Sequence, residues 1–349
     1  DTIYFISDTR SEGGSTGEIS RFYYQLKYYY HLNIDVKTTV SDVVFKSASD
    51  MEVKKDERIL SLLNLYTSTE NDSKALSASA INTYINCPLQ FCFLYLETIQ
   101  QKEEITETIE NDTFGNILHA VMAMLYEPFT LKTIDREQLN MLMSNDNMIE
   151  RLLSQAFGFY YFKKPKGTVV ELEGNNLLIA KILKKYIKGI LARDAEYAPF
   201  TYLGGEIPVR SVVATRFGTV NLKGYIDRID KKEDRIRLVD YKTGNGTLTF
   251  NSWDVMFDLT EKSSNRPKHI FQTLLYCYLY KEKSGNSQVS PGLFYTRKVF
   301  DEMFSTDLGY KAEPKVTNTI HNYYEYENEF LPRLMKCIED IMNPDIPFF

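Results

Sequence analysis

Two apolar stretches interrupted by charged residues, GYIDRID at 224–230 and LVDYKTG at 238–244, are separated by a short charged turn. The first stretch carries Asp227, and the second carries Asp240 and Lys242. Successive side chains of a β-strand point to opposite faces, so Asp240 and Lys242 share a face. A hairpin partner strand can place Asp227 opposite them. We therefore predict two carboxylates and one ammonium at one end of a strand pair.

This combination of charges suits a hard divalent cation. Carboxylate oxygens are ligands of Mg²⁺ or Mn²⁺, and Lys242 could hold a nucleophile or stabilise developing charge. Alternatively, Asp240 and Lys242 are ordinary charges on a solvated edge strand, because Asp-x-Lys is common by chance. The apolar residues 238–239 and the polar turn 243–244 indicate a buried strand that ends abruptly. With the second carboxylate of Asp227, this context favours the cation site.

The spacing of apolar residues predicts a mixed α/β architecture. Alternation with a period of two predicts antiparallel strands over 203–213, 218–229 and 235–241, with a hairpin turn at 231–234. Helical spacing predicts helices over about 113–127, 176–197, 268–281 and 322–342, and a further strand is expected at 292–296. Upstream, Ser77 or Ser79 can cap one helix and Pro88 can begin the next.

Composition limits the class of protein. No apolar run approaches the roughly 18 residues that span a bilayer, so no transmembrane helix is expected. Four scattered cysteines without a CxxC pair argue against a disulfide scaffold or zinc ribbon, and they predict a reducing, cytoplasmic location. The chain starts at Asp1 without a methionine, which suggests a fragment of something longer.

The net charge of −6 gives no global attraction to a polyanion. Nucleic-acid binding would therefore need local basic residues. Candidates for following a phosphate backbone, each more simply read as solvated surface, are Arg210, Arg216, Lys223, Arg228, Lys268 and Arg297.

Five motifs occur in an order that resembles the RecB/AddB-like branch of the PD-(D/E)XK nuclease superfamily. They are LSAS at 76–79 with Cys87-Pro88 downstream, FGNILH at 114–119, Asp227, DYKTG at 240–244, and Gln272-x-x-x-Tyr276. The match covers about residues 76–300. It implies a restriction-endonuclease-like core, a mixed β-sheet flanked by helices, with additional N-terminal helices.

The resemblance also implies roles for individual residues. His119, Asp227 and Asp240 would be metal ligands, with the Tyr241 carbonyl as a further ligand, and Lys242 would be the catalytic lysine. The expected cofactor is Mg²⁺ or Mn²⁺.

Three further residues match the family pattern near the site. Glu206 corresponds to a glutamate that often lies close to it. Gln272 and Tyr276 share a helix face at i, i+4 spacing and would steady the site or touch DNA. Taken alone, Glu206 is read as a surface glutamate, Gln272 and Tyr276 as helix packing, and His119 as a core histidine.

Some family members bind an iron–sulfur cluster through one cysteine before the nuclease core and a clustered trio after it. Cys87 fits the first position, but the tail offers only Cys337. Four thiolates cannot be assembled in this way, so no iron–sulfur cluster is expected.

The resemblance also predicts the organisation of the chain. Residues 1–75 would be the remnant of a preceding helicase-like module and a linker, with SDTR at 7–10 as part of that module, and residues 76–349 the nuclease domain. The expected partners are DNA and a helicase module or helicase–nuclease subunit.

Three functions are consistent with this pattern. The first is a divalent-metal-dependent DNA nuclease, expected to be an exonuclease in DNA repair or recombination. The second is a catalytically silent module of the same fold that binds DNA or a partner helicase subunit. The third is an unrelated scaffold with incidental charges. Intact Asp227, Asp240 and Lys242 favour the enzyme, since a decayed site would usually have lost one of them.

Overall fold

The computed structural model describes residues 20–35, 51–70, 73–99, 110–285, 288–313 and 316–349. The chain divides into two compact units, Asp1–Asp50 and Met51–Phe349. In the first unit, the described residues form helix α1, Arg21–Tyr24, continued by a π-helical turn, Gln25–Tyr29. The SDTR segment at 7–10 lies outside the described residues.

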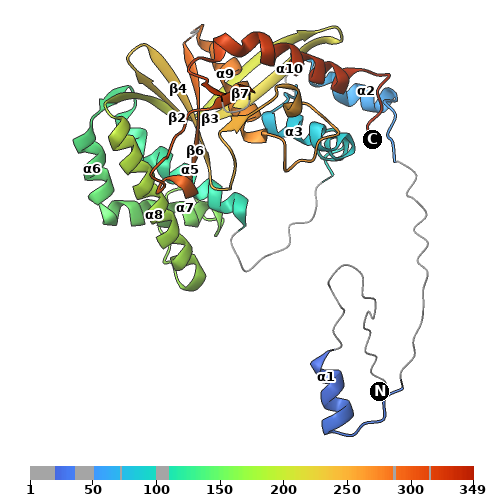
Figure 1. Cartoon of the computed structure of the whole chain (residues 1–349), viewed down its shortest axis with the longest axis vertical. Coiled ribbons are helices and arrows are strands. Elements are labelled where there is room, and N and C mark those ends of the chain that lie inside the picture. The colour runs from blue at the N-terminus through green and yellow to red at the C-terminus, as the bar shows by residue number, and fades with distance from the viewer. Residues whose placement is uncertain (1–19, 36–50, 71–72, 100–109, 286–287, 314–315) are drawn as a thin grey trace. The chain divides into compact units, whose positions relative to one another are not determined.

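A five-stranded sheet in the order β1-β2-β3-β4-β6 forms the centre of the second unit (Figure 1). Its strands are Lys132–Ile134, Phe200–Thr215, Gly218–Lys232, Arg235–Lys242 and Val289–Tyr295. Neighbouring strands are antiparallel from β1 to β4, whereas β4 and β6 are parallel. Parallel neighbours need a crossover connection, which here includes α9, Lys268–Ser284. The predicted strands and the helix after them are confirmed, and β1 is an addition that was too short to predict.

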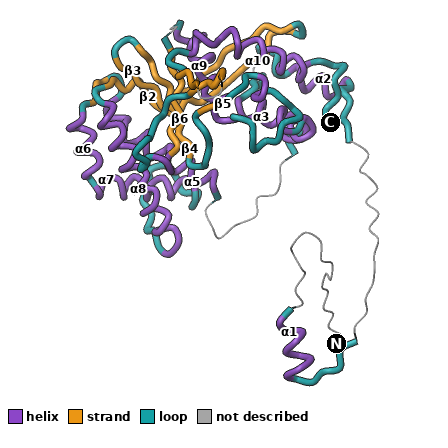
Figure 2. The backbone as a smooth tube through the Cα atoms, viewed as in Figure 1, coloured by secondary structure: helices purple, strands orange, loops and turns teal. Residues whose placement is uncertain are grey.

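Two hydrophobic cores lie on opposite faces of this sheet. On β4, Leu238 belongs to one core and the next residue, Val239, to the other, as strand alternation requires. The Leu238 core contains residues of α2 (Glu57–Asn64), α3 (Ala78–Asn86), α4 (Pro88–Phe91), α9 and α10 (Glu327–Met342). The Val239 core contains residues of α5 (Asn111–Tyr126), α6 (Arg136–Ser144), α7 (Asp146–Tyr160) and α8 (Gly174–Tyr197). Figure 2 shows helices on both sides of the strands, so the predicted mixed sheet flanked by helices is confirmed.

The sequence did not predict α6, α7 or a second, three-stranded sheet. That sheet has the order β5-β7-β8 and consists of Thr249–Phe250, Gly309–Glu313 and Val316–Thr319. Its strands are too short to show a clear alternation of apolar and polar residues. Short 3-10 helices occur at Glu127–Phe129, Asp254–Met256, Thr296–Lys298 and Tyr323–Tyr326, and a π-helical turn follows α4 at Cys92–Leu96.

Residues that precede the predicted domain boundary at 75/76 pack onto the second unit. Val53 pairs with Phe348, and Leu76 pairs with Leu222 of β3. Ser77 caps α3 by accepting a hydrogen bond from the Ala80 N–H at 3.2 Å, which selects it over Ser79. The assignment of 1–75 to a preceding module stays a prediction.

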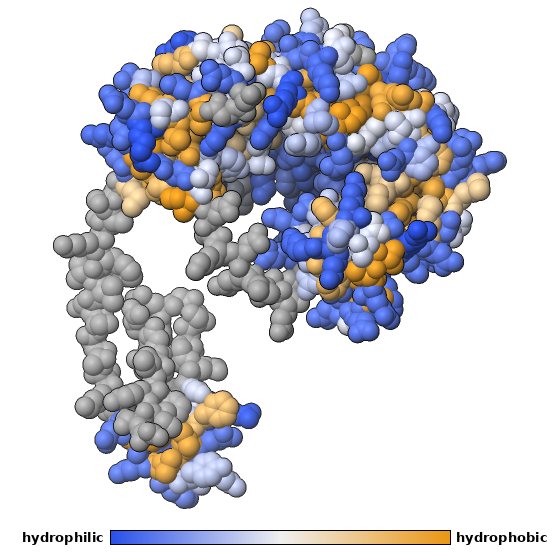
Figure 3. Space-filling view, turned by 180° about the vertical axis from the view of Figure 1, so that it is seen from behind, coloured by the Kyte–Doolittle hydropathy of each residue, from blue (hydrophilic) through white to orange (hydrophobic). Residues whose placement is uncertain are grey.

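The surface of the second unit carries hydrophobic side chains in small groups between hydrophilic ones on the face seen in Figure 3. Within the part of the chain that the structure describes, no helix is both long and apolar enough to cross a membrane.

Candidate active site

The candidate site forms where β3 and β4 separate. The two strands pair from Lys232 and Arg235 up to Arg228 and Val239. Beyond that point, the Asp227 carboxylate accepts a hydrogen bond from the Tyr241 backbone N–H, at 2.8 Å. A side chain thus satisfies a backbone donor that a continued strand pair would otherwise use.

His119 reaches this point from α5. Its Nδ1 lies 3.3 Å from Asp227 Oδ1, and its Nε2 lies 2.9 Å from the Tyr241 carbonyl oxygen. Burial opposes protonation of this imidazole, but the Asp227 carboxylate outweighs burial and raises the pKa of His119 to about 9. A protonated ring can donate to both oxygens at once. Asp227 and His119 therefore hold the Tyr241 peptide group from its two sides.

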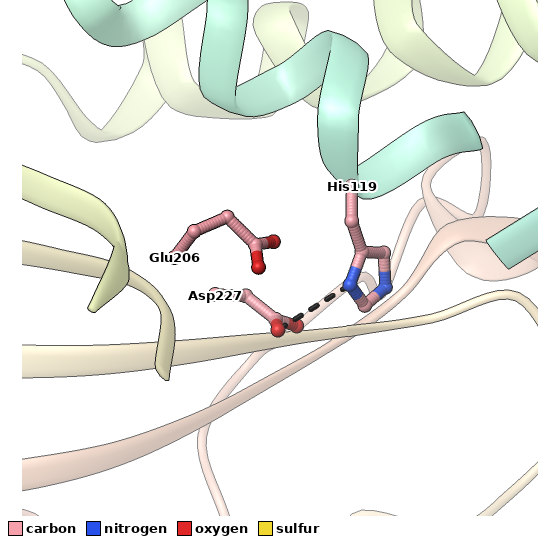
Figure 4. Close-up of side chains that lie close together, drawn as sticks. All are labelled: His119, Glu206 and Asp227. Atoms are coloured by element: carbon pink, nitrogen blue, oxygen red, sulfur yellow. Dashed lines mark ion pairs between the residues drawn. The ribbon is translucent and has the colours of Figure 1, made fainter. Parts of the chain in front are cut away.

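Glu206 completes a cluster of possible ligands. The pairs Gly205–Arg228 and Ile207–Ile226 flank it, which places Glu206 of β2 opposite Asp227. Ligand atoms of His119, Glu206 and Asp227 all lie within 4.8 Å of one another. Figure 4 shows the three side chains pointing toward one another.

An irregular stretch of β2 positions Glu206. The register shifts between Tyr202 and Gly204, and Glu206 has a φ of 52°, which side-chain-bearing residues rarely adopt. At Gly205, a Cβ atom would lie 2.6 Å from the Tyr202 hydroxyl, so a side chain there would clash. Loss of water contact and the Asp227 charge raise the pKa of Glu206.

Asp240 and Lys242 lie on the same face of β4, as predicted, and form an ion pair. Lys242 Nζ lies 2.8 Å from Asp240 Oδ2, and the Asp240 side chain is only 2 % exposed. Burial raises the pKa of Asp240 to about 6, although Lys242 opposes this rise. Burial works against the Lys242 charge, but Asp240 outweighs it and raises the pKa of Lys242.

Gln272 and Tyr276 of α9 bind this pair from above the strand. The Gln272 Oε1 atom accepts from Lys242 Nζ at 3.2 Å, and its Nε2 donates to Asp240 Oδ1 at 3.2 Å. The same Nε2 atom lies 2.8 Å from the Tyr276 hydroxyl oxygen. Gly224 of β3 makes room for the Tyr276 ring, because a Cβ atom there would lie 2.7 Å from it. These contacts are those of residues that hold Asp240 and Lys242 in place.

The structure thus brings the predicted residues together in two groups. His119, Glu206 and Asp227 form the first, and Asp240 and Lys242, with α9 above them, form the second. The Tyr241 peptide joins the groups, since it bonds to both His119 and Asp227 and lies between Asp240 and Lys242 in the chain. The Asp240 carboxylate turns toward Lys242 and is not part of the first group.

The available donor atoms fit a divalent cation. Carboxylate oxygens, an imidazole nitrogen and a peptide oxygen suit Mg²⁺ or Mn²⁺. Asp240 Oδ2 is buried and accepts no well-aligned hydrogen bond from any residue that the structure describes, despite its ion pair. A buried carboxylate oxygen with free lone pairs is available to a metal ion.

One sequence expectation is wrong. Arg228, a candidate for contact with a phosphate backbone, is 1 % exposed. Its Nη1 donates to Asp194 Oδ2 at 2.6 Å and to the Tyr241 hydroxyl at 3.0 Å, and its Nη2 lies 2.8 Å from Asp230 Oδ2. A buried ionic network therefore supports Tyr241 from the α8 side.

Sequence reasoning missed this network, although a signal was present. Asp194 stands in the apolar helix α8, and Arg228, Asp230 and Arg237 stand in strands whose neighbours are buried. Charges in such positions need partners, because an unpaired charge is costly to bury.

The chain spans only part of the proteins that it resembles, which are named as one of the subunits of an ATP-dependent helicase/deoxyribonuclease. It is 28 % identical over 243 residues to the one from Carboxydothermus hydrogenoformans, an alignment covering 64 % of this chain and 20 % of that protein. The protein of the same name in Caldanaerobacter subterraneus is 23 % identical over 315 residues, 84 % of this chain and 24 % of the relative. The chain therefore matches about a fifth to a quarter of the length of these relatives, and their names confirm the RecB/AddB-like resemblance.

The match to a family model covers most of the chain. The model described as "PD-(D/E)XK nuclease superfamily" matches residues 75–348, which include both groups of the candidate site and the whole five-stranded sheet. This chain belongs to the PD-(D/E)XK nuclease superfamily.

Proposed function

We propose that this chain is a divalent-metal-dependent nuclease domain that hydrolyses phosphodiester bonds of DNA. The observation that carries the proposal is the arrangement around Tyr241. Its peptide group binds Asp227 and His119 while Asp240 and Lys242 flank it in the chain. One short strand end thus collects the carboxylates, imidazole and ammonium that such a reaction requires.

His119, Asp227, Asp240 and the Tyr241 carbonyl would hold Mg²⁺ or Mn²⁺. When bound, the ion polarises the scissile phosphate and makes water a stronger nucleophile. His119 must release a proton before its ring can act as a ligand, so metal binding competes with protonation. Asp227 and Asp240 supply negative charge that His119 and Lys242 balance in the metal-free protein.

Lys242 is the proposed catalytic lysine. Its ammonium is held by Asp240 and by Gln272, so its position is set before substrate arrives. A preorganised cation stabilises negative charge that develops on the phosphate or on the attacking oxygen. Glu206 is exposed beside Asp227 and would bind or orient water at the rim of the site.

The biological setting is proposed from the relatives' name. We expect an exonuclease that acts in DNA repair or recombination, in the cytoplasm, together with a helicase module or helicase–nuclease subunit. The proposed organisation is a helicase-like remnant and linker at 1–75 and the nuclease domain at 76–349.

Degradation of end-labelled single- and double-stranded DNA with Mg²⁺, with and without EDTA, tests the activity. Cleavage that EDTA abolishes is expected, and products released one by one from an end would support an exonuclease. Calorimetric titration with Mn²⁺ should show binding by the wild type and by Asp234→Ala, a control in the exposed hairpin turn, but weaker binding by Asp240→Ala. A wild type that binds no Mn²⁺ would refute the proposal.

A further inference from the structure

A polar cavity of about 540 Å³ adjoins the candidate site. Its wall includes residues 245–247, which follow Lys242 in the chain, and residues 263–270, which lead into α9. Tyr295 also lines it, and Tyr295 pairs with Lys242 across β4 and β6. The Tyr295 hydroxyl hydrogen-bonds to His269 Nδ1 at 3.0 Å. The cavity therefore lies next to the strand end that carries the catalytic lysine.

The N-terminus of α9 opens into this cavity. The helix has 17 residues, and its N-cap, Pro267, provides no side-chain cap. The backbone N–H groups of His269 and Ile270, both in the cavity wall, meet no acceptor among the residues described. Free N–H groups and the helix dipole give this end a partial positive charge that attracts anions.

A buried arginine provides independent evidence for an anion. Arg266 lines the cavity and is 5 % exposed. Its Nη2 donates to Asn86 Oδ1 at 3.3 Å, but its Nε and Nη1 have no hydrogen-bond partner in the described part of the chain. An unpaired buried guanidinium is costly, and its planar N–H groups match the geometry of a phosphate.

We propose that this cavity binds a phosphate group of the DNA strand adjacent to the phosphate that is cleaved. The inference rests on the proposed nuclease function and adds a subsite to it. Arg266 and the α9 backbone N–H groups would bind the phosphate oxygens, and the exposed Lys268 would add a second cation. The polar side chains of Ser263, Ser264 and Asn265 leave the wall open to hydrogen bonding with that anion.

Ser264→Glu tests the subsite without disturbing the core. Ser264 is an exposed residue of the cavity wall, so a glutamate there repels an incoming phosphate. Ser61→Glu, on the exposed surface of α2, is the matched control for the added charge. Affinity for a single-stranded oligonucleotide is measured in EDTA by fluorescence anisotropy. We expect Ser264→Glu to bind about tenfold more weakly than Ser61→Glu, a difference of one decade in Kd.

Neutral phosphate analogues identify the group that is bound. In oligonucleotides with a single methylphosphonate, one position should lower wild-type affinity but leave the affinity of Ser264→Glu unchanged. Lys268→Gln gives a second variant, which should lessen the slope of log affinity against log salt by about 0.7, the value for one contact with single-stranded nucleic acid.

Two results separate this subsite from the nuclease function itself. If the wild type cleaves DNA and Ser264→Glu binds as tightly as Ser61→Glu, the subsite is wrong and the nuclease stands. If no protein cleaves DNA but the methylphosphonate effect depends on Ser264, the subsite stands and the nuclease proposal fails. Equal methylphosphonate losses in wild type and Ser264→Glu would also overturn the subsite.

Discussion

Asp227 and Tyr241 form a hydrogen bond from the Tyr241 backbone N–H to the Asp227 carboxylate, at 2.8 Å, where the β3–β4 pairing ends. The bond fixes one carboxylate at the mouth of the strand pair. It also orients the Tyr241 carbonyl, which lies on the other side of the same residue and contacts His119. The charge state of His119 therefore depends on the carboxylate that holds this peptide group.

Asp227→Asn should lower the pKa of His119 in the metal-free protein. The wild-type pKa of His119 is about 9, because the Asp227 carboxylate outweighs burial, whereas a free imidazole titrates near 6.5. His119 therefore stabilises the folded state fully below pH about 6.5, and this contribution is lost as pH rises through about 9. NMR titration of His119 should show the lowered pKa, and denaturation in EDTA should show a flatter pH dependence between those values. An unchanged His119 titration would contradict the ion pair.

Lys242→Ala should lower DNA cleavage by about 10²- to 10³-fold, the usual loss when one preorganised charge is removed from a site. The fold should survive, because Lys242 is partly exposed and Asp240 can take up a proton. Lys231→Ala, on the exposed end of β3, is the control. Single-turnover cleavage and thermal melting give the two readouts, and undiminished cleavage would refute the assigned role.

Gln272→Met separates positioning from DNA contact. The substitution removes the bridge between Lys242 and Asp240 while keeping a similar volume. If Gln272 positions the pair, kcat should fall by about 10- to 100-fold with little change in KM, as for other residues that support a metal site. A rise in KM at constant kcat would instead identify a contact with DNA.

Glu206→Gly should affect stability and cleavage differently. Glu206 has a φ of 52°, which costs a side-chain-bearing residue energy but costs glycine none. We expect the free energy of unfolding to stay within about 1 kcal/mol of the wild type, while cleavage falls with loss of the carboxylate. Urea denaturation and cleavage assays on the same protein measure both. A large loss of stability would show that Glu206 is a structural residue.

Arg228→Met should destabilise the fold strongly. It would leave the Asp194 and Asp230 carboxylates buried without one of their cations, at a cost of about 3–5 kcal/mol. Arg210→Met, at an exposed position of the neighbouring strand β2, should change stability by less than about 0.5 kcal/mol. Equal unfolding midpoints for the two variants would mean that the buried network does not contribute as described.

Periodicity predicted much of this fold because alternation and helical spacing are local properties of the chain. The strands of the hairpin, the parallel strand after α9 and the long helices were all visible as patterns. The short strands β1, β5, β7 and β8 were not, since two to five residues give no clear period and are held in place by their partners.

The candidate site divides in the same way. The shared face of Asp240 and Lys242 follows from strand alternation alone, whereas His119, Asp227 and Glu206 come together from α5, β3 and β2. Strand separation after Arg228, the irregular backbone at Glu206 and the burial of Arg228 each depend on residues distant in the chain. Local chemistry could name the ligands, but only packing between distant elements could decide which atoms meet, because distances between elements are set by the cores that they share.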